Sequence, residues 1–167
     1  MSNTEIGDKA YDKMRQRHVE DDLMGLSCYN IADPDASPKG TSQLNLVTLK
    51  FGEPWLRLPP TAYFREKYRS ADNMLRTLEK VYPGIRDRIE ELEVATPLTH
   101  MRYLGHPAGS IYGFEKQMKD SLFFQPGGQS PIQGLYFASG WSGDPGFQPT
   151  LEAGRAAAKS ILKELGA

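Results

Sequence analysis

A glycine-rich turn between a short apolar run and a helix is the part of the sequence with the clearest chemical use. The apolar run, residues 134–138, predicts a short strand, the turn covers 139–148, and Pro149 suits the first turn of a helix that ends near Leu165. A helix N-terminus offers unpaired N–H groups and a partial positive charge, and glycines let the backbone approach a ligand closely. The pattern therefore predicts an anion or cofactor site, although by itself it is more often an ordinary strand–turn–helix packed on a sheet.

Gly154 lies in the middle of this predicted helix. Glycine at such a position costs about 1 kcal/mol relative to alanine, so its presence predicts close approach of the helix to a strand or to a cofactor.

Other residue types with chemical potential are sparse. The histidines His18, His100 and His106 have no partner at a metal-binding spacing such as H-E-x-x-H, so no metal site is predicted. The single cysteine, Cys28, rules out an internal disulfide and a four-thiolate metal site. The chain contains neither G-x-G-x-x-G nor a G-x-x-x-x-G-K phosphate loop.

The amino-acid composition limits which binding partners and which cellular compartment we expect for the protein. Lys and Arg number 20 against 21 Asp and Glu, so the sequence lacks the basic surplus of a general nucleic-acid binder. No apolar run approaches the ~20 residues that span a bilayer, which leaves peripheral membrane contact as the only membrane association expected. One lone cysteine fits a reducing compartment, and we expect a cytoplasmic location.

The elements that must position these residues begin with a predicted strand pair. Residues 23–31 and 43–51 are apolar and predict two antiparallel strands, joined across the turn-forming loop 33–40. Residues 1–22 have apolar positions at nearly helical spacing and predict a short exposed or docking helix. Residues 94–103 are β-prone.

A long amphipathic helix is predicted over residues 62–82, before the helix-ending Pro83-Gly84. We expect its apolar face to pack on the two strands; the residues expected to be buried on it are Phe64, Tyr68, Leu75 and Leu78. A second helix is predicted from Ile85 to Leu92, and Trp55 is expected near the entrance of an apolar cavity, with core packing as the alternative.

The same motifs resemble those of the phytoene desaturase family of flavoproteins, which includes carotenoid isomerases and retinol saturases and is amine oxidase-like. The segment from Leu135 to Trp141, the Gly/Pro turn and the stretch from Gly154 to Ala158 resemble the family's C-terminal FAD-binding segment. Motifs upstream are similar as well: Asp33-Pro34 to Gly40, Thr96 to Thr99, Arg102-Tyr103 and Gly109 to Gly113. The resemblance covers about residues 24–165, although the family's run of adjacent glycines is replaced here by residues 143–148.

This resemblance implies an α/β fold, α+β in part, that is incomplete without a partner chain. Residues 1–22 would be an N-terminal extension or docking segment, 23–133 part of a substrate domain, and 134–167 the last strand, turn and helix of a Rossmann-like FAD domain. The implied cofactor is FAD.

The resemblance also implies roles for individual residues. Ser139, Gly140 and Trp141 would lie by the ribityl–pyrophosphate stretch of FAD. The backbone around four residues would face the N1–C2=O edge of the isoalloxazine: Gln148, Pro149, Thr150 and Leu151. His100 and Tyr112 are the candidates for a catalytic acid or base, and the substrate would be apolar or conjugated.

Three interpretations stay open at this point. The chain could be the small subunit of a split flavoenzyme, with a larger flavoprotein subunit supplying the G-x-G-x-x-G βαβ unit. It could instead be a non-catalytic binding or scaffolding subunit derived from such an enzyme, or a fragment of a longer chain. We favour the first, because a flavin site cut in two would expose apolar surface unless a partner covered it.

Overall fold

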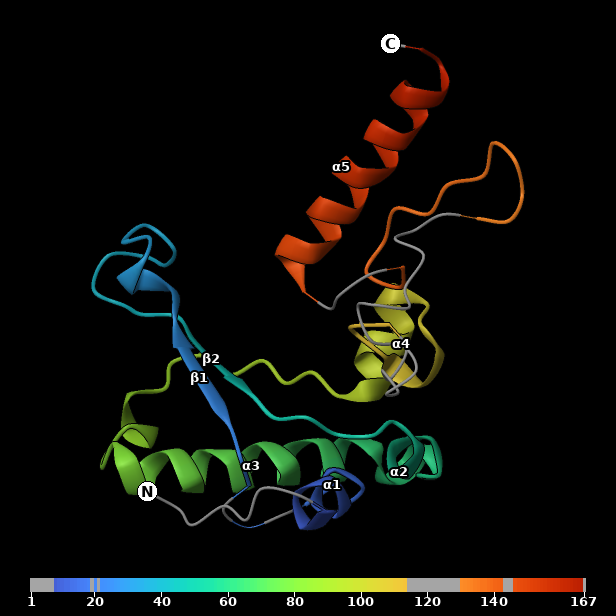
Figure 1. Ribbon diagram of the computed structural model, residues 1–167. Helices are drawn as coiled ribbons and strands as arrows, with labels where there is room; N and C mark the ends of the chain where they lie inside the picture. The colour runs from blue at the N-terminus through green and yellow to red at the C-terminus, as the bar shows by residue number, and fades with distance from the viewer. Residues whose placement is uncertain (1–7, 19, 21, 114–129, 143–145, 167) are drawn as a thin grey trace. The chain divides into compact units, whose positions relative to one another are not determined.

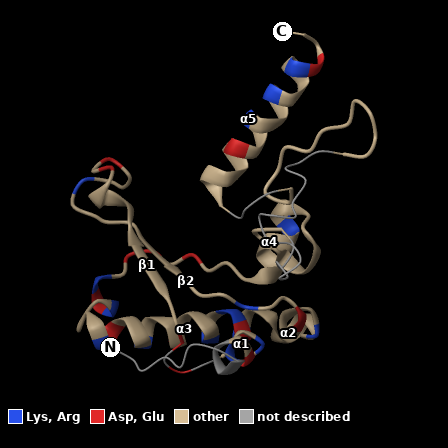
Figure 2. Ribbon diagram, in the orientation of Figure 1, with Lys and Arg blue, Asp and Glu red and all other residues tan. Residues whose placement is uncertain are grey.

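The computed structural model describes residues 8–18, 20, 22–113, 130–142 and 146–166, which form two compact units. Unit 1 comprises Met1–Gly109 and unit 2 comprises Ser110–Ala167. Figure 1 shows the elements of each, and Figure 2 shows charges of both signs on α3 and α5 but none along β1 or β2. The combination of helices with a two-stranded sheet agrees with the predicted mixed α and β class.

Unit 1 contains the predicted strand pair. β1 (Gly25–Cys28) pairs antiparallel with β2 (Leu44–Val47), with Gly25 opposite Val47 and Cys28 opposite Leu44. Both strands are shorter than predicted. β1 ends at Cys28 because the chain continues directly into a short 3-10 helix at Tyr29–Ile31. Asn30 holds the connecting loop together: its side chain donates to Ser37 Oγ at 2.8 Å and accepts from the Gln43 backbone N–H at 2.7 Å.

Helix α3 (Tyr63–Val81) confirms the long predicted helix. Its periodicity was assigned correctly, because Ala71, Leu75 and Leu78 are buried on one face. The first turns of the same face are not covered: Phe64 is 65% exposed and Tyr68 52%, so their predicted burial is wrong. The chain after α3 contacts the helix in two places: Arg86 pairs with Asp72 in the middle of the helix, and Thr96 hydrogen-bonds Tyr63 at its first residue.

Helix α4 (Pro97–Leu104) replaces the β-prone segment that the sequence suggested. Thr96 is the N-cap of this helix and forms a reciprocal capping box with Thr99, while Pro97 occupies the first turn and Gly105 ends the helix at φ +69°. These capping interactions outweigh the β-propensity of the threonines. The second helix predicted from Ile85 shrinks to one 3-10 turn, Arg86–Arg88.

Two short helices and two further 3-10 turns complete unit 1. They are α1 (Asp8–Met14), α2 (Glu53–Leu56), and the turns Pro60–Ala62 and Pro107–Gly109. Trp55 in α2 is only 2% exposed, so it belongs to the core rather than to a cavity entrance. No helix of the described residues is both long and apolar enough to cross a membrane.

Unit 2 contains helix α5 (Phe147–Glu164), which confirms the predicted C-terminal helix. The strand predicted over 134–138 is not formed as a strand: only Tyr136 in this run makes a bridge. A strand needs a neighbour along its length to satisfy its backbone groups, and the only sheet of the described residues is the β1–β2 pair of unit 1.

Candidate functional site

Three segments of unit 2 come together beside the start of α5: residues 110–113, 139–142 and 146–151. A Cβ atom on Gly113 would lie 2.9 Å from the Gly140 carbonyl oxygen and 3.2 Å from Trp141 Cα. A Cβ atom on Gly140 would in turn lie 3.1 Å from Thr150 Oγ1. The two glycines therefore permit backbone approaches that a larger residue would obstruct, and we call these three segments the loop cluster.

The turn at residues 139–142 is organised by its own serines. The Trp141 N–H donates to Ser139 Oγ at 3.1 Å, and Ser142 Oγ donates to the Ser139 carbonyl at 2.9 Å. The Ser139 N–H donates to Ser142 Oγ at 3.2 Å. Both hydroxyls thus shape the backbone, which leaves Gly140 as the residue of the turn that faces the helix.

The first turn of α5 has the features of an anion-binding helix end. It begins after Gly146, which has φ +122°, and it has no side-chain cap and no acidic residue in its first turn. Thr150 Oγ1 donates to the Gly146 carbonyl at 2.8 Å, while Gln148 Nε2 donates to Glu152 Oε1 at 2.9 Å. The positive end of the helix dipole is therefore not neutralised by an acid of the first turn.

The structure brings together most of the residues that the sequence singled out. Ser139, Gly140 and Trp141 lie in the loop cluster, as do Gln148, Pro149, Thr150 and Leu151. The cluster also includes Tyr112, whose ring is 53% exposed. His100 lies in α4 of unit 1, where it is half-buried.

Gly154 does not make the close approach to a strand that its mid-helix position suggested. An added Cβ atom would meet nothing within 4 Å among the described residues. Its approach to a cofactor stays a prediction.

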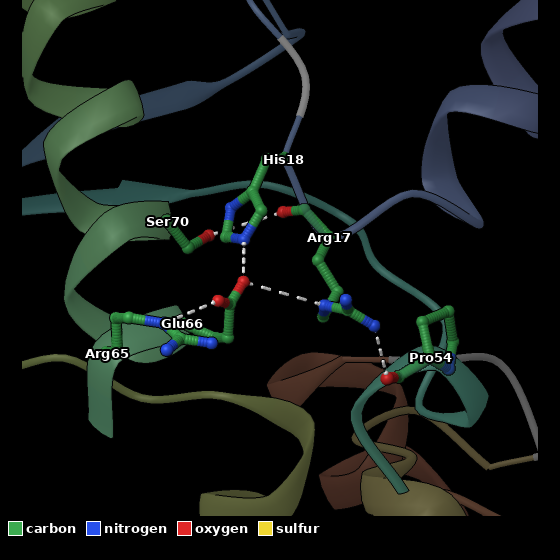
Figure 3. Close-up of polar contacts among 6 residues, drawn as sticks. All are labelled: Arg17, His18, Pro54, Arg65, Glu66 and Ser70. Carbon is green, nitrogen blue, oxygen red and sulfur yellow. Dashed lines mark hydrogen bonds and ion pairs between the residues drawn. The ribbon is translucent and has the colours of Figure 1, made fainter. Parts of the chain in front are cut away.

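Sequence reasoning missed a buried ionic cluster in unit 1, drawn in Figure 3. Glu66 of α3 is only 6% exposed, and its Oε2 atom lies 2.6 Å from His18 Nε2 and 4.0 Å from Arg17 Nε. Its Oε1 atom accepts from Arg65 Nε at 3.1 Å. The hydrogen bond to His18, followed by that to Arg65, holds the pKa of the Glu66 carboxyl below its ordinary value. His18 and Glu66 are 48 positions apart, so no local pattern in the sequence indicates that their side chains meet.

In the described part of the chain, no group of three or more His, Cys, Asp or Glu side chains is placed to bind a metal ion.

Comparisons with known proteins identify several relatives. Prolycopene isomerase of Arabidopsis thaliana, described as chloroplastic, is 33% identical over 112 residues, which is 66% of this chain and 19% of the relative. All-trans-retinol 13,14-reductase of Danio rerio is 30% identical over 113 residues, covering 62% of this chain and 18% of the relative. Pyridine nucleotide-disulfide oxidoreductase domain-containing protein 2 of Rattus norvegicus is 27% identical over 144 residues, covering 80% and 23% respectively.

The chain spans about a fifth of the length of these curated relatives. No family model matches the sequence, and no solved structure resembles it closely enough to count as a match. The relatives nevertheless agree with the family resemblance of the sequence motifs. The chain is therefore related to the carotenoid isomerase- and desaturase-like FAD-dependent oxidoreductases.

Proposed function

We propose that this chain is the small subunit of a split FAD-dependent oxidoreductase of the desaturase, saturase or isomerase type. In this proposal the loop cluster holds part of FAD, and a larger flavoprotein subunit supplies the dinucleotide-binding βαβ unit. The observation that carries the proposal is the packing of Gly113, Gly140 and Thr150 at the first turn of α5. It joins three separate segments at a helix end suited to an anionic group.

The residues of the loop cluster fit a flavin in chemical character. Gly113 and Gly140 let their two segments pack closely against each other and against Thr150 at the helix end, and Trp141 is half-buried in the same turn. Ser139, Gly140 and Trp141 would lie by the ribityl–pyrophosphate stretch, and the backbone around Gln148 and Leu151 would face the isoalloxazine. Pro149 has no N–H to donate, and the Thr150 N–H already donates to the Gly146 carbonyl at 3.2 Å within the helix. Bound FAD would supply the redox chemistry. The helix end would stabilise negative charge on the reduced flavin.

Exposed apolar side chains of unit 2 support the involvement of a second chain. Phe147 is 96% exposed and Leu151 71%, and both belong to the first turns of α5. Among the described residues of unit 2, no large apolar side chain is buried. A second chain that covered this surface and paired with residues 134–138 would supply the sheet and the core that unit 2 needs.

The substrate proposed by analogy with the relatives is apolar or conjugated. His100 and Tyr112 stay the candidates for a catalytic acid or base. The competing function is a non-catalytic binding or scaffolding subunit, which would assemble with the same larger subunit without contributing to the flavin site.

Flavin content tests the proposal. The chain would be purified alone and also after co-expression with a larger flavoprotein that carries G-x-G-x-x-G, and flavin absorbance would be measured after gel filtration. We expect no flavin with the chain alone and a stoichiometric flavin band with the complex. Flavin retained by the isolated chain would overturn the split site. A complex whose flavin content does not depend on this chain would indicate scaffolding.

A further inference from the structure

The N-terminal segment of unit 1 supplies two of the side chains that contact the Glu66 carboxylate. The Glu66 carboxylate contacts His18 Nε2 at 2.6 Å and Arg17 Nε at 4.0 Å, and both residues belong to this segment. The remaining cation, Arg65, is the sequence neighbour of Glu66 and has a side chain that is 75% exposed. The more enclosed contacts of Glu66 therefore come from a segment far away in the sequence.

The rest of this segment, residues 8–18, is attached mainly through polar atoms and rings; we call it the strap. The Phe51 N–H donates to the Met14 carbonyl at 3.0 Å, and Arg17 Nη1 donates to the Pro54 carbonyl at 2.8 Å. The rings of Tyr11 and Phe51 meet edge to face at 5.2 Å. None of the strap side chains that the structure describes, those of residues 11–18, belongs to the buried core.

A small hollow lies between the strap, α3 and the neighbouring extended segments. Arg17 and His18 line it from the strap, and α3 contributes Ser70, Asn73, Met74 and Thr77. The remaining lining comes from Asp22, Met24, Thr48 and Lys50. Here Lys50 Nζ lies 2.5 Å from Asp22 Oδ2, and Thr48 Oγ1 donates to the same oxygen at 3.0 Å.

We propose that the strap is a lid over this hollow, latched by the charge of Glu66. The closed strap places His18 and Arg17 against the Glu66 carboxylate, which is 6% exposed in this state, and opening it leaves that carboxylate with Arg65 alone. Removing one partner of a buried ion pair leaves the other charge uncompensated, so the closed strap depends strongly on this contact. With few apolar contacts to hold it, the strap is the part of unit 1 that opens first. Opening exposes the α3 residues that line the hollow.

Limited trypsin digestion of the full chain at fixed pH tests the latch, since the strap contains cleavage sites after Lys13, Arg15 and Arg17. Cleavage in the loop at Lys39 serves as the internal reference. We expect Glu66→Gln to raise cleavage after Arg15 relative to Lys39 by about tenfold, because proteolysis follows the population of the open strap. The matched control is Glu53→Gln, whose side chain is 59% exposed and pairs only with Arg57 among the contacts described; it should leave the ratio unchanged.

A second variant keeps the test decisive if Glu66→Gln unfolds unit 1, which cleavage inside α3 at Arg69 and Arg76 would reveal. His18→Ala removes the 2.6 Å contact with Glu66, and it should release the strap severalfold while α3 stays protected. Unchanged cleavage after Arg15 in a folded variant would overturn the proposal. Equal cleavage at Arg15 and Lys39 in the unaltered chain would also overturn it.

Discussion

Alanine substitutions at two glycines of unit 2, Gly113 and Gly134, distinguish the effect of close packing from the effect of backbone strain. Gly113 has φ +86° and an added Cβ would lie 2.9 Å from the Gly140 carbonyl oxygen, whereas Gly134 has φ +77° and open space around it. Alanine at either position carries a strain of about 1–3 kcal/mol, and only Gly113→Ala also disturbs the loop cluster. We expect Gly113→Ala to weaken FAD binding by the assembled complex about tenfold or more beyond the effect of Gly134→Ala, measured by flavin titration. Equal losses would mean that the close approach has no role.

Contacts between residues close together in the sequence could be predicted from it, whereas contacts between distant residues could not. The loop cluster residues Ser139, Gly140 and Thr150 could be grouped in advance, because turn chemistry and a helix start act over a few residues. Glu66 could not be singled out, since its partner His18 is 48 residues away and the two meet only through the fold. Thr96 was noted for its resemblance to a family motif, while its role as a helix cap became visible only with Thr99 and Tyr63 in place.

At the scale of elements, the packing of the buried face of helix α3 can be tested by substitution. Leu75 is 9% exposed on the buried face, and Val81 in the same helix is 68% exposed. Leu75→Ala should lower the free energy of unfolding by about 2–5 kcal/mol, because it removes buried methyl groups and leaves a cavity. Val81→Ala should change it by less than about 0.5 kcal/mol. Urea unfolding of the full chain measures both, and an unchanged midpoint for Leu75→Ala would show that this face is not packed.

The predictions of helices and strands are confirmed where the apolar periodicity extends over several turns. They are wrong where helix capping, or the lack of a neighbouring strand, determines the local structure. Helices α3 and α5 repeat their apolar positions over several turns, which local sequence alone shows. Helix α4 has only 8 residues, and a capping box determined its start in spite of the β-prone residues around it. The run 134–138 has strand-like residues, yet among the residues that the structure describes it pairs with no strand along its length.

The distribution of buried side chains describes the molecule as a whole. The large apolar side chains that are buried in the described residues are Trp55, Leu75 and Leu78, all in unit 1. In α5 and at the residue that caps its C-terminus, Phe147, Leu151 and Leu165 are all more than two-thirds exposed. Composition could not reveal this division, because both units are rich in apolar residues; it depends on which of them find partners within the chain. This asymmetry is why the proposed function places the larger subunit against unit 2.

Acid stability is the property of the whole folded chain that the Glu66 cluster controls. Contacts with His18 and Arg65 lower the pKa of Glu66 from its ordinary value of 4.5, so in acid the unfolded chain binds a proton more readily than the folded one. The stabilisation is fully present above that ordinary value and disappears as the pH falls through the lowered pKa of the folded state. We therefore expect Glu66→Gln to destabilise the chain near neutral pH and to lose this disadvantage progressively in acid.

Urea unfolding between about pH 7 and pH 3 measures this difference, with the exposed Glu53→Gln as the control that should follow the unaltered chain at every pH. The sign of the effect distinguishes an ion-paired carboxylate from one that is merely buried. Burial alone would raise the pKa of Glu66, and the glutamine variant would then gain stability relative to the unaltered chain near neutral pH. A Glu66→Gln chain that is equally stable at neutral pH, or more stable, would therefore contradict both the ion pairing of Glu66 and its role in holding the strap.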